Sequence, residues 1–130
     1  MQAAFLFCSD ANARPDGKLD IQGVFNELYA NDFPARQQRL VLVGVVEWPR
    51  ELDGRIPFAV DLVDAAGLAI FSIEGHTEVD ARPKSRAPAK THFVLPMDNV
   101  MFPSPGCYRA RINLHGKDVP GPTMHLLRKQ

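Results

Sequence analysis

Apolar residues recur at every second position in several short segments of this chain, a period that is typical of half-buried β-strands. Residues 56–63 and 108–114 follow this pattern most clearly. Residues 40–46 are instead continuously apolar, which indicates a central strand covered on both faces. In all, the pattern predicts eight strands: Ala3–Cys8, Leu19–Tyr29, Leu40–Val46, Ile56–Val63, Leu68–Val79, His92–Met97, Tyr108–Leu114 and Thr123–Arg128.

Turn-forming residues separate these segments. The chain has 11 prolines and 9 glycines, and clusters such as Pro15-Asp16-Gly17 and Asp64–Gly67 stand between apolar runs. No segment keeps a helical period over three turns. We therefore predict an all-β fold, an antiparallel two-sheet β-sandwich of immunoglobulin-like or jelly-roll-like type, with residues 1–130 as a single domain. An up-and-down barrel is the alternative, because alternation does not distinguish open sheet edges from a closed sheet.

The position of Tyr108 in the sequence favours the prediction of an immunoglobulin-like sandwich. The Pro105-Gly106-Cys107-Tyr108 stretch leads directly into an alternating strand. Immunoglobulin-like sandwiches place a tyrosine at this kind of corner, where its ring packs inward and its hydroxyl bonds to the backbone. We expect the same arrangement for Tyr108.

The balance of acidic and basic residues indicates which classes of partner to expect. Fifteen basic and fifteen acidic residues give a formal net charge of zero. Nucleic-acid-binding domains usually carry a basic surface, and proteins held by anionic lipid carry basic clusters. No segment reaches the roughly 20 apolar residues of a membrane span. We therefore expect neither nucleic acid nor a membrane among the partners.

The start of the chain and its cysteines indicate the compartment. The first ten residues lack the basic region and the long apolar run of a signal peptide, so we expect a cytoplasmic protein. In that compartment Cys8 and Cys107 stay reduced, although pairing remains open if the fold brings them together. Neither cysteine has metal-ligand spacing, and no phosphate-binding glycine motif is present, so no cofactor is predicted.

Several short segments occur in an order that resembles a known family. They are Cys8-Ser9-Asp10-Ala11, Gly17-Lys18-Leu19-Asp20-Ile21-Gln22-Gly23-Val24-Phe25, Phe33-Pro34 and Pro105-Gly106-Cys107-Tyr108. In a family of small bacterial proteins of unknown function, a "CD-A" start leads into a "GKLNI-G-F" strand and then to "FP" and "PG-Y". The resemblance implies a bacterial origin and a β-rich single domain, and it supplies no reaction.

A polar face on one predicted strand offers candidate metal ligands. Glu74, His76, Glu78 and Asp80 would stand on one face at about 7 Å intervals. Carboxylates and imidazole bind zinc, manganese or iron. Because a straight strand spreads these groups apart, His92 or His125 would have to complete such a site. A solvated outer face is the alternative.

Two loops offer candidate contacts for a protein partner. Residues 82–90 carry Arg82, Lys84, Arg86 and Lys90 with no acidic residue between them, which would suit an acidic partner or a phosphate backbone. A solvated connecting loop is the alternative. Phe33 lies in another predicted loop and either anchors a partner or folds back over the end of the sandwich.

No predicted cluster combines a nucleophile, a base and a binding pocket, so the sequence does not predict an enzyme. The first hypothesis is a non-enzymatic accessory module that binds another protein or self-assembles, with a homodimer as the simplest assembly. The second is a metal-binding or carbohydrate-binding site on the sandwich surface.

Overall fold

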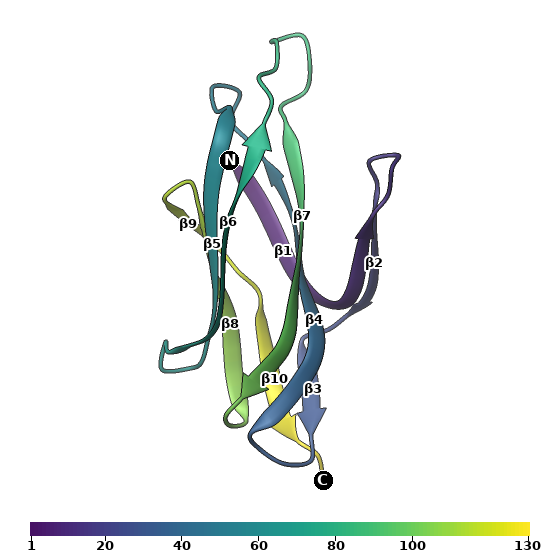
Figure 1. Ribbon diagram of the computed structural model, residues 1–130, viewed down its shortest axis with the longest axis vertical. Coiled ribbons are helices and arrows are strands. Elements are labelled where there is room, and N and C mark those ends of the chain that lie inside the picture. Colours follow the sequence, from purple (N-terminus) through teal and green to yellow (C-terminus); the bar gives the residue numbers. More distant parts are fainter.

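Strands dominate the structure. The computed structural model describes residues 1–130 and contains ten strands and no helix (Figure 1). None of its segments is therefore a helix with the length and hydropathy needed to cross a membrane. The strands are β1 (Gln2–Ala13), β2 (Leu19–Val24), β3 (Glu27–Ala30), β4 (Ala35–Glu47), β5 (Gly54–Val63), β6 (Ala69–Val79), β7 (Lys90–Phe102), β8 (Gly106–Leu114), β9 (Lys117–Val119) and β10 (Thr123–Arg128).

The strands form two sheets. Sheet 1 has the order β2-β1-β4-β7, and sheet 2 has the order β3-β10-β8-β5-β6, with β9 also paired to β8. All pairs are antiparallel except β3 with β10. In the variable-type immunoglobulin plan, strands G, F, C and C′ lie in one sheet and face A, B and E. In this chain, the positions of G, F, C and C′ are occupied by β10, β8, β5 and β6. The positions of A, B and E are occupied by β1, β4 and β7. The prediction of a β-sandwich is confirmed, and the barrel is excluded.

The core lies between the two sheets. Alternate residues of each strand point inward, as the period of two predicts, and nineteen buried residues form one cluster. Leu42 of sheet 1 and Leu62 of sheet 2 are both fully buried within it. Phe58 and Phe93 meet edge to face across the sheets, with ring centroids 5.3 Å apart. Burial of this apolar surface is the main force that holds the sheets together.

A second, smaller cluster lies on the outer face of sheet 1. Leu40 and Leu42 of β4 point into the main core, whereas Val41 and Val43 point the other way and are still buried, together with Cys8. Their cover includes residues of the β1–β2 hairpin, which stands as a separate arm beside β4 and β7 in Figure 1. The prediction that this strand is covered on both faces is thus confirmed.

Several strand ends differ from the prediction. β4 begins five residues earlier than predicted, β7 continues five residues further, and β9 is an additional strand. Two further differences affect how the sheets are connected. β1 continues to Ala13 because residues 8–13 pair with β2, although the predicted strand ends at Cys8. The expected strand Leu19–Tyr29 divides into β2 in sheet 1 and β3 in sheet 2. At the crossing, the Phe25 amide donates to the carbonyl oxygen of Phe7 in sheet 1, and the Asn26 carbonyl accepts from the His125 amide in sheet 2. The backbone therefore stays paired while the chain changes sheets.

Tyr108 occupies the predicted corner. Its ring is buried and meets Phe102 edge to face at 4.9 Å, and its hydroxyl donates to the carbonyl oxygen of Ser104 at 2.6 Å. We expect Tyr108→Phe to lower the free energy of unfolding by about 1 kcal/mol, because the ring contact remains while one hydrogen bond is lost. Urea unfolding followed by tryptophan fluorescence measures this change. An unchanged unfolding midpoint would show that the hydroxyl bond contributes nothing.

Candidate functional site

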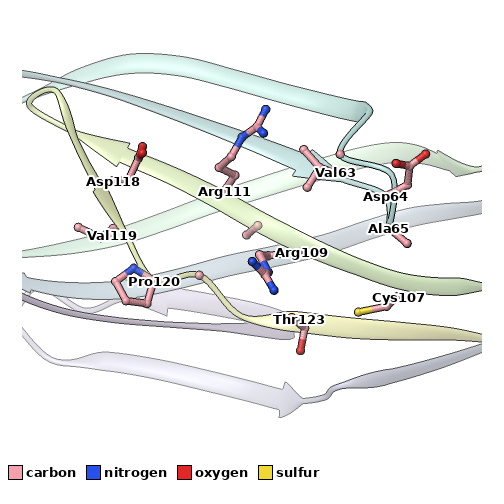
Figure 2. A pocket seen from close by; sticks show the side chains of 13 residues that line it. Val63, Asp64, Ala65, Cys107, Arg109, Arg111, Asp118, Val119, Pro120 and Thr123 are labelled. Atoms are coloured by element: carbon pink, nitrogen blue, oxygen red, sulfur yellow. The ribbon is translucent and has the colours of Figure 1, made fainter.

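A groove lies on the outer face of sheet 2. Its volume is about 780 Å³, and it is lined by residues from three segments, 63–67, 107–111 and 118–123 (Figure 2). β8 forms the floor, and the other two segments form the walls. These segments are separated in sequence, and the strand order of sheet 2 brings them together.

The first wall is the turn between β5 and β6. One carboxylate oxygen of Asp64 accepts hydrogen bonds from the amides of Ala66 at 3.0 Å and Leu68 at 2.8 Å. Gly67 has a φ of +85°, a conformation that glycine adopts without steric cost. Asp64 and Gly67 therefore fix the shape of this wall.

The second wall is the connection from β9 to β10, which follow one another along the same edge of β8. The Ala110 amide donates to the Pro122 carbonyl oxygen at 3.0 Å, so the Pro120-Gly121-Pro122 segment continues the pairing between the two strands. A Cβ atom at Gly121 would overlap the carbonyl oxygen of Ala110. Only glycine allows the wall to lie this close to the floor.

The floor carries two arginines, of which one forms an ion pair and the other does not. Arg109 and Arg111 point out of the same face of β8, about 7 Å apart along the strand. The Arg111 guanidinium forms an ion pair with Asp61 at 3.5 Å, and the Ser72 hydroxyl donates to the same carboxylate at 2.6 Å. The Arg109 backbone pairs with Val63 and Thr123, but its side chain forms no ion pair or hydrogen bond within the chain. In Figure 2 it lies in the middle of the lining residues, whereas Arg111 extends toward β5.

An exposed apolar pair lies on the same face of sheet 2, beyond the groove. Tyr29 of β3 is 60% exposed and is the register partner of Leu127 of β10, which is 37% exposed. The Tyr29 hydroxyl donates to the Glu27 carboxylate at 2.9 Å. This hydrogen bond, together with the negative charge of Glu27, raises the pKa of Tyr29 above its ordinary value of 10. The phenol therefore stays neutral at physiological pH.

The metal-ligand candidates from the sequence lie on the outer face of the edge strand β6. Glu74, His76 and Glu78 are all exposed, and Glu74 lines a separate hollow of about 260 Å³. Nδ1 of His76 lies 3.2 Å from the guanidinium of Arg55. No three His, Cys, Asp or Glu side chains converge in an arrangement that could hold a metal ion.

Two histidines had been considered as ligands that would complete such a site. His92 is on β7 in sheet 1, so the sandwich separates it from β6. His125 is on β10, three strands away from β6 in sheet 2. The structure therefore does not bring either histidine to the Glu74–Glu78 face.

The candidate partner-binding loop is held partly by its own backbone contacts. The Arg82 guanidinium donates to the Ala87 carbonyl oxygen at 3.4 Å, and Arg50 donates to the carbonyl oxygen of Arg86 at 2.6 Å. Lys84 and Arg86 are exposed. Their side chains form no ion pair, so this loop carries two free cations.

Phe33, the other partner-binding candidate, folds back against the sandwich. It is half-buried and packs against the main core. The guanidinium carbon of Arg128 lies 5.3 Å from the centre of its ring, a distance at which a cation attracts an aromatic face. Phe33 thus closes one end of the sandwich, the second of the two roles considered for it.

The two cysteines do not form a disulfide. Cys8 is buried beside β4 in sheet 1, and Cys107 is half-buried on the groove floor in sheet 2. Burial raises the pKa of the Cys8 thiol, and the nearby Asp10 carboxylate adds to this effect. Both causes keep Cys8 in the unreactive thiol form at neutral pH.

We expect one thiol per folded chain to react with a disulfide reagent such as dithionitrobenzoate at neutral pH, and that thiol is Cys107. Cys107→Ser should abolish the reaction in the folded state, and Cys8→Ser should leave it unchanged. The absorbance of the released thiolate measures the stoichiometry. Two thiols reacting at the same rate would contradict the burial of Cys8.

The groove was not predicted from the sequence. The alternation of residues 108–114 placed Arg109 and Arg111 on the polar face, but it gave no reason to separate them from other solvated side chains. The Pro120-Gly121-Pro122 segment was the one local signal of an unusual backbone.

Comparison with other proteins gives limited information about function. No curated protein matches this chain. A solved structure of the alkylpurine DNA glycosylase AlkC from Pseudomonas fluorescens, bound to DNA containing an abasic site analog, is similar to it, with a TM-score of 0.44 and 15% sequence identity. The match covers 78% of this chain and 28% of the glycosylase chain, so this chain spans about a quarter of that protein.

The expectation that nucleic acid is not a partner was drawn from the net charge of zero, and the protein in this match is bound to DNA. A net charge of zero describes the chain as a whole. It does not show that each cation has a counter-charge nearby, and the side chains of Arg109, Lys84 and Arg86 form no ion pair. The exclusion of nucleic acid is therefore withdrawn. A TM-score of 0.44 gives no ground for assigning DNA binding or glycosylase activity to this chain.

The expected membership of a family without an assigned function is confirmed. One family model matches residues 3–125, which include all strands from β2 to β9. The match extends over the groove floor and both of its walls. The chain belongs to the family of unknown function DUF6941.

Proposed function

We propose that this chain is a non-enzymatic protein-interaction module whose partner lies across the outer face of sheet 2. The observation that carries this proposal is the position of the groove next to the exposed Tyr29–Leu127 pair on one face. Along β10, Thr123, His125 and Leu127 point out of this face at intervals of about 7 Å and connect the pair to the groove.

The residue types on this face favour protein binding. Tyrosine and arginine are enriched among the side chains that contribute most to protein interfaces. Tyr29 offers a rigid apolar ring with a polar tip, and Arg109 offers a guanidinium without a partner in the chain. A partner that covers both would bury apolar surface and satisfy a free cation.

The carboxylates around the groove favour binding over catalysis. Asp64 accepts from the amides of its own turn, Asp118 accepts from the Asn113 side chain at 3.1 Å, and Asp61 is held by Arg111. Proton transfer needs a group that is free to reach the substrate. These acidic groups are instead engaged in holding the strands and turns.

The occupant that suits this face is an extended segment of another protein. The floor residues 107–111 span about 13 Å along β8, enough for several residues of an extended chain. The walls supply apolar contacts from Val63, Ala65, Val119 and Pro120. The floor supplies the free charge of Arg109, so the groove offers both affinity and orientation.

Selection from a displayed random-peptide library on the folded chain tests the proposal. We expect peptides that bind the wild type to be lost on Leu127→Asp and retained on Val24→Asp, a matched change of an exposed aliphatic residue in sheet 1. Peptides that bind both variants equally would contradict the proposed face. Failure to enrich any peptide above an unrelated control protein would also contradict it.

Light scattering distinguishes another protein from a second copy. We expect a monomer for the wild type and for Leu127→Asp. A wild-type dimer that Leu127→Asp dissociates would show that the face binds a second copy of this chain, and it would overturn the proposal of a different partner.

A further inference from the structure

On the basis of the proposed function, we infer that the groove selects acidic segments, with the guanidinium of Arg109 binding the carboxylate of an aspartate or glutamate side chain. The guanidinium is planar and presents paired N–H donors that match the two oxygens of a carboxylate. Arg109 is therefore the specificity-determining residue of the groove.

The contrast with Arg111 supports this role for Arg109. The two side chains leave the same face of the same strand, but Arg111 is held by Asp61, which in turn accepts from Ser72. The Arg111 charge is thereby largely balanced within the sheet. Val63, the β5 partner of Arg109, is apolar and provides no such counter-charge.

The local charge favours a carboxylate over a phosphate. The groove lining contains two arginines and two aspartates, Asp64 and Asp118, and Asp61 pairs with Arg111 from outside the lining. Arg109 is therefore the one lining cation without an ion pair, and it lies among fixed acidic groups. A carboxylate brings one negative charge to Arg109. A phosphate group with two negative charges would be repelled more strongly by the two aspartates.

The position of Arg109 favours a side chain over a chain terminus. Arg109 is the central residue of the floor segment 107–111, with Cys107 on one side and Arg111 on the other. A segment lying in the groove extends past Arg109 in both directions. The carboxylate that reaches it therefore comes from a side chain in the middle of the segment.

Calorimetric titration with a selected peptide tests the inference. We expect Arg109→Gln to weaken binding about 10- to 100-fold, as loss of a hydrogen-bonded charge pair does, and Arg109→Lys to restore part of that loss. Replacing the acidic residue of the peptide by its amide should weaken binding to the wild type equally and should not affect Arg109→Gln further. Arg36→Gln, an exposed arginine of β4 without an ion pair, is the matched control and should bind as the wild type does.

A second variant changes binding in the opposite direction. Asp61→Asn removes a negative charge beside the floor and releases Arg111, so we expect the same acidic peptide to bind up to about 5-fold more tightly. A misfolded variant would not bind more tightly, so this result separates a charge effect from structural damage. Weaker binding by Asp61→Asn would contradict the inference.

The outcomes separate the inference from the proposed function. The selected peptides could bind the face of sheet 2 without sharing an acidic residue and could bind Arg109→Gln as tightly as the wild type. That result would overturn the inference and leave the proposed function standing. A single-stranded oligonucleotide that displaces the peptide from the wild type at low salt but does not bind Arg109→Gln would show that the groove takes phosphodiesters, and it would also overturn the inference. No peptide binding at all would contradict the proposed function itself.

Discussion

Substituting Gly121 by alanine is expected to lower the free energy of unfolding by about 3 kcal/mol or more. The added Cβ atom would overlap the carbonyl oxygen of Ala110 and lie 2.8 Å from its carbonyl carbon. These are backbone atoms of β8, a strand paired on both edges, and they cannot move aside as a flexible side chain can. The Pro120–Pro122 segment must shift instead, at the expense of the hydrogen bond from the Ala110 amide to Pro122.

Gly17→Ala is the matched control. Gly17 has a φ of +85° and open space around it, so alanine there brings backbone strain of about 1–2 kcal/mol without a collision. Urea unfolding followed by the fluorescence of the single tryptophan measures both variants. If Gly121→Ala were no less stable than Gly17→Ala, the close approach of the groove wall to its floor would be wrong.

Trp48→Ala is expected to cost about 3–5 kcal/mol of stability. Trp48 is 1% exposed and follows the last residue of β4. Its indole nitrogen donates to the Thr91 hydroxyl at 2.7 Å, and its amide donates to the carbonyl oxygen of Ala89 at 2.9 Å. The side chain therefore fills the core and also bonds to the start of β7, so truncation would leave both a cavity and an unpaired hydroxyl.

Two milder variants separate packing from hydrogen bonding at this position. Trp48→Phe keeps most of the aromatic volume and is expected to cost about 1–2 kcal/mol. Thr91→Val removes the acceptor and leaves the indole N–H unpaired, and the double variant completes a thermodynamic cycle. Circular dichroism follows unfolding, since tryptophan fluorescence is lost in Trp48→Phe. Full additivity of the two changes would contradict a hydrogen bond between these side chains.

Much of the fold could be predicted because alternation records which face of a strand is buried. Residues 56–63 and 108–114 form β5 and β8 with the expected inward residues, and the predicted turn at Asp64–Gly67 connects β5 to β6. Tyr108 was found because a corner of this kind requires a tyrosine whose hydroxyl reaches back along the backbone. Local chemistry determines each of these features.

The features that were missed depend on pairing between distant segments. Residues 9–13 have no apolar alternation, and they become part of β1 because β2 pairs with them. The alternation through Leu19, Ile21 and Phe25 passes through Gly23, which has a φ of +66°. A glycine within a strand indicates a bulge or a close backbone approach, but it does not show that the chain changes sheets two residues later. β9 is three residues long and is defined only by its pairing with β8.

The groove could not be predicted for the same reason. The distinction between Arg109 and Arg111 comes from register, because Asp61 lies opposite Arg111 and Val63 lies opposite Arg109. Register between β5 and β8, which are far apart in the sequence, is not visible in the alternation of either strand. A one-residue shift would exchange the faces of the strand and remove the difference.

A nuclear magnetic resonance titration of the isotope-labelled chain with a selected acidic peptide tests the location of the binding surface most directly. We expect the largest amide shift changes in residues 107–111 and 119–123, the floor and one wall of the groove, with smaller changes near Leu127. Largest changes in the loop 81–89 or in the β1–β2 hairpin would place the ligand elsewhere and contradict a binding surface on sheet 2.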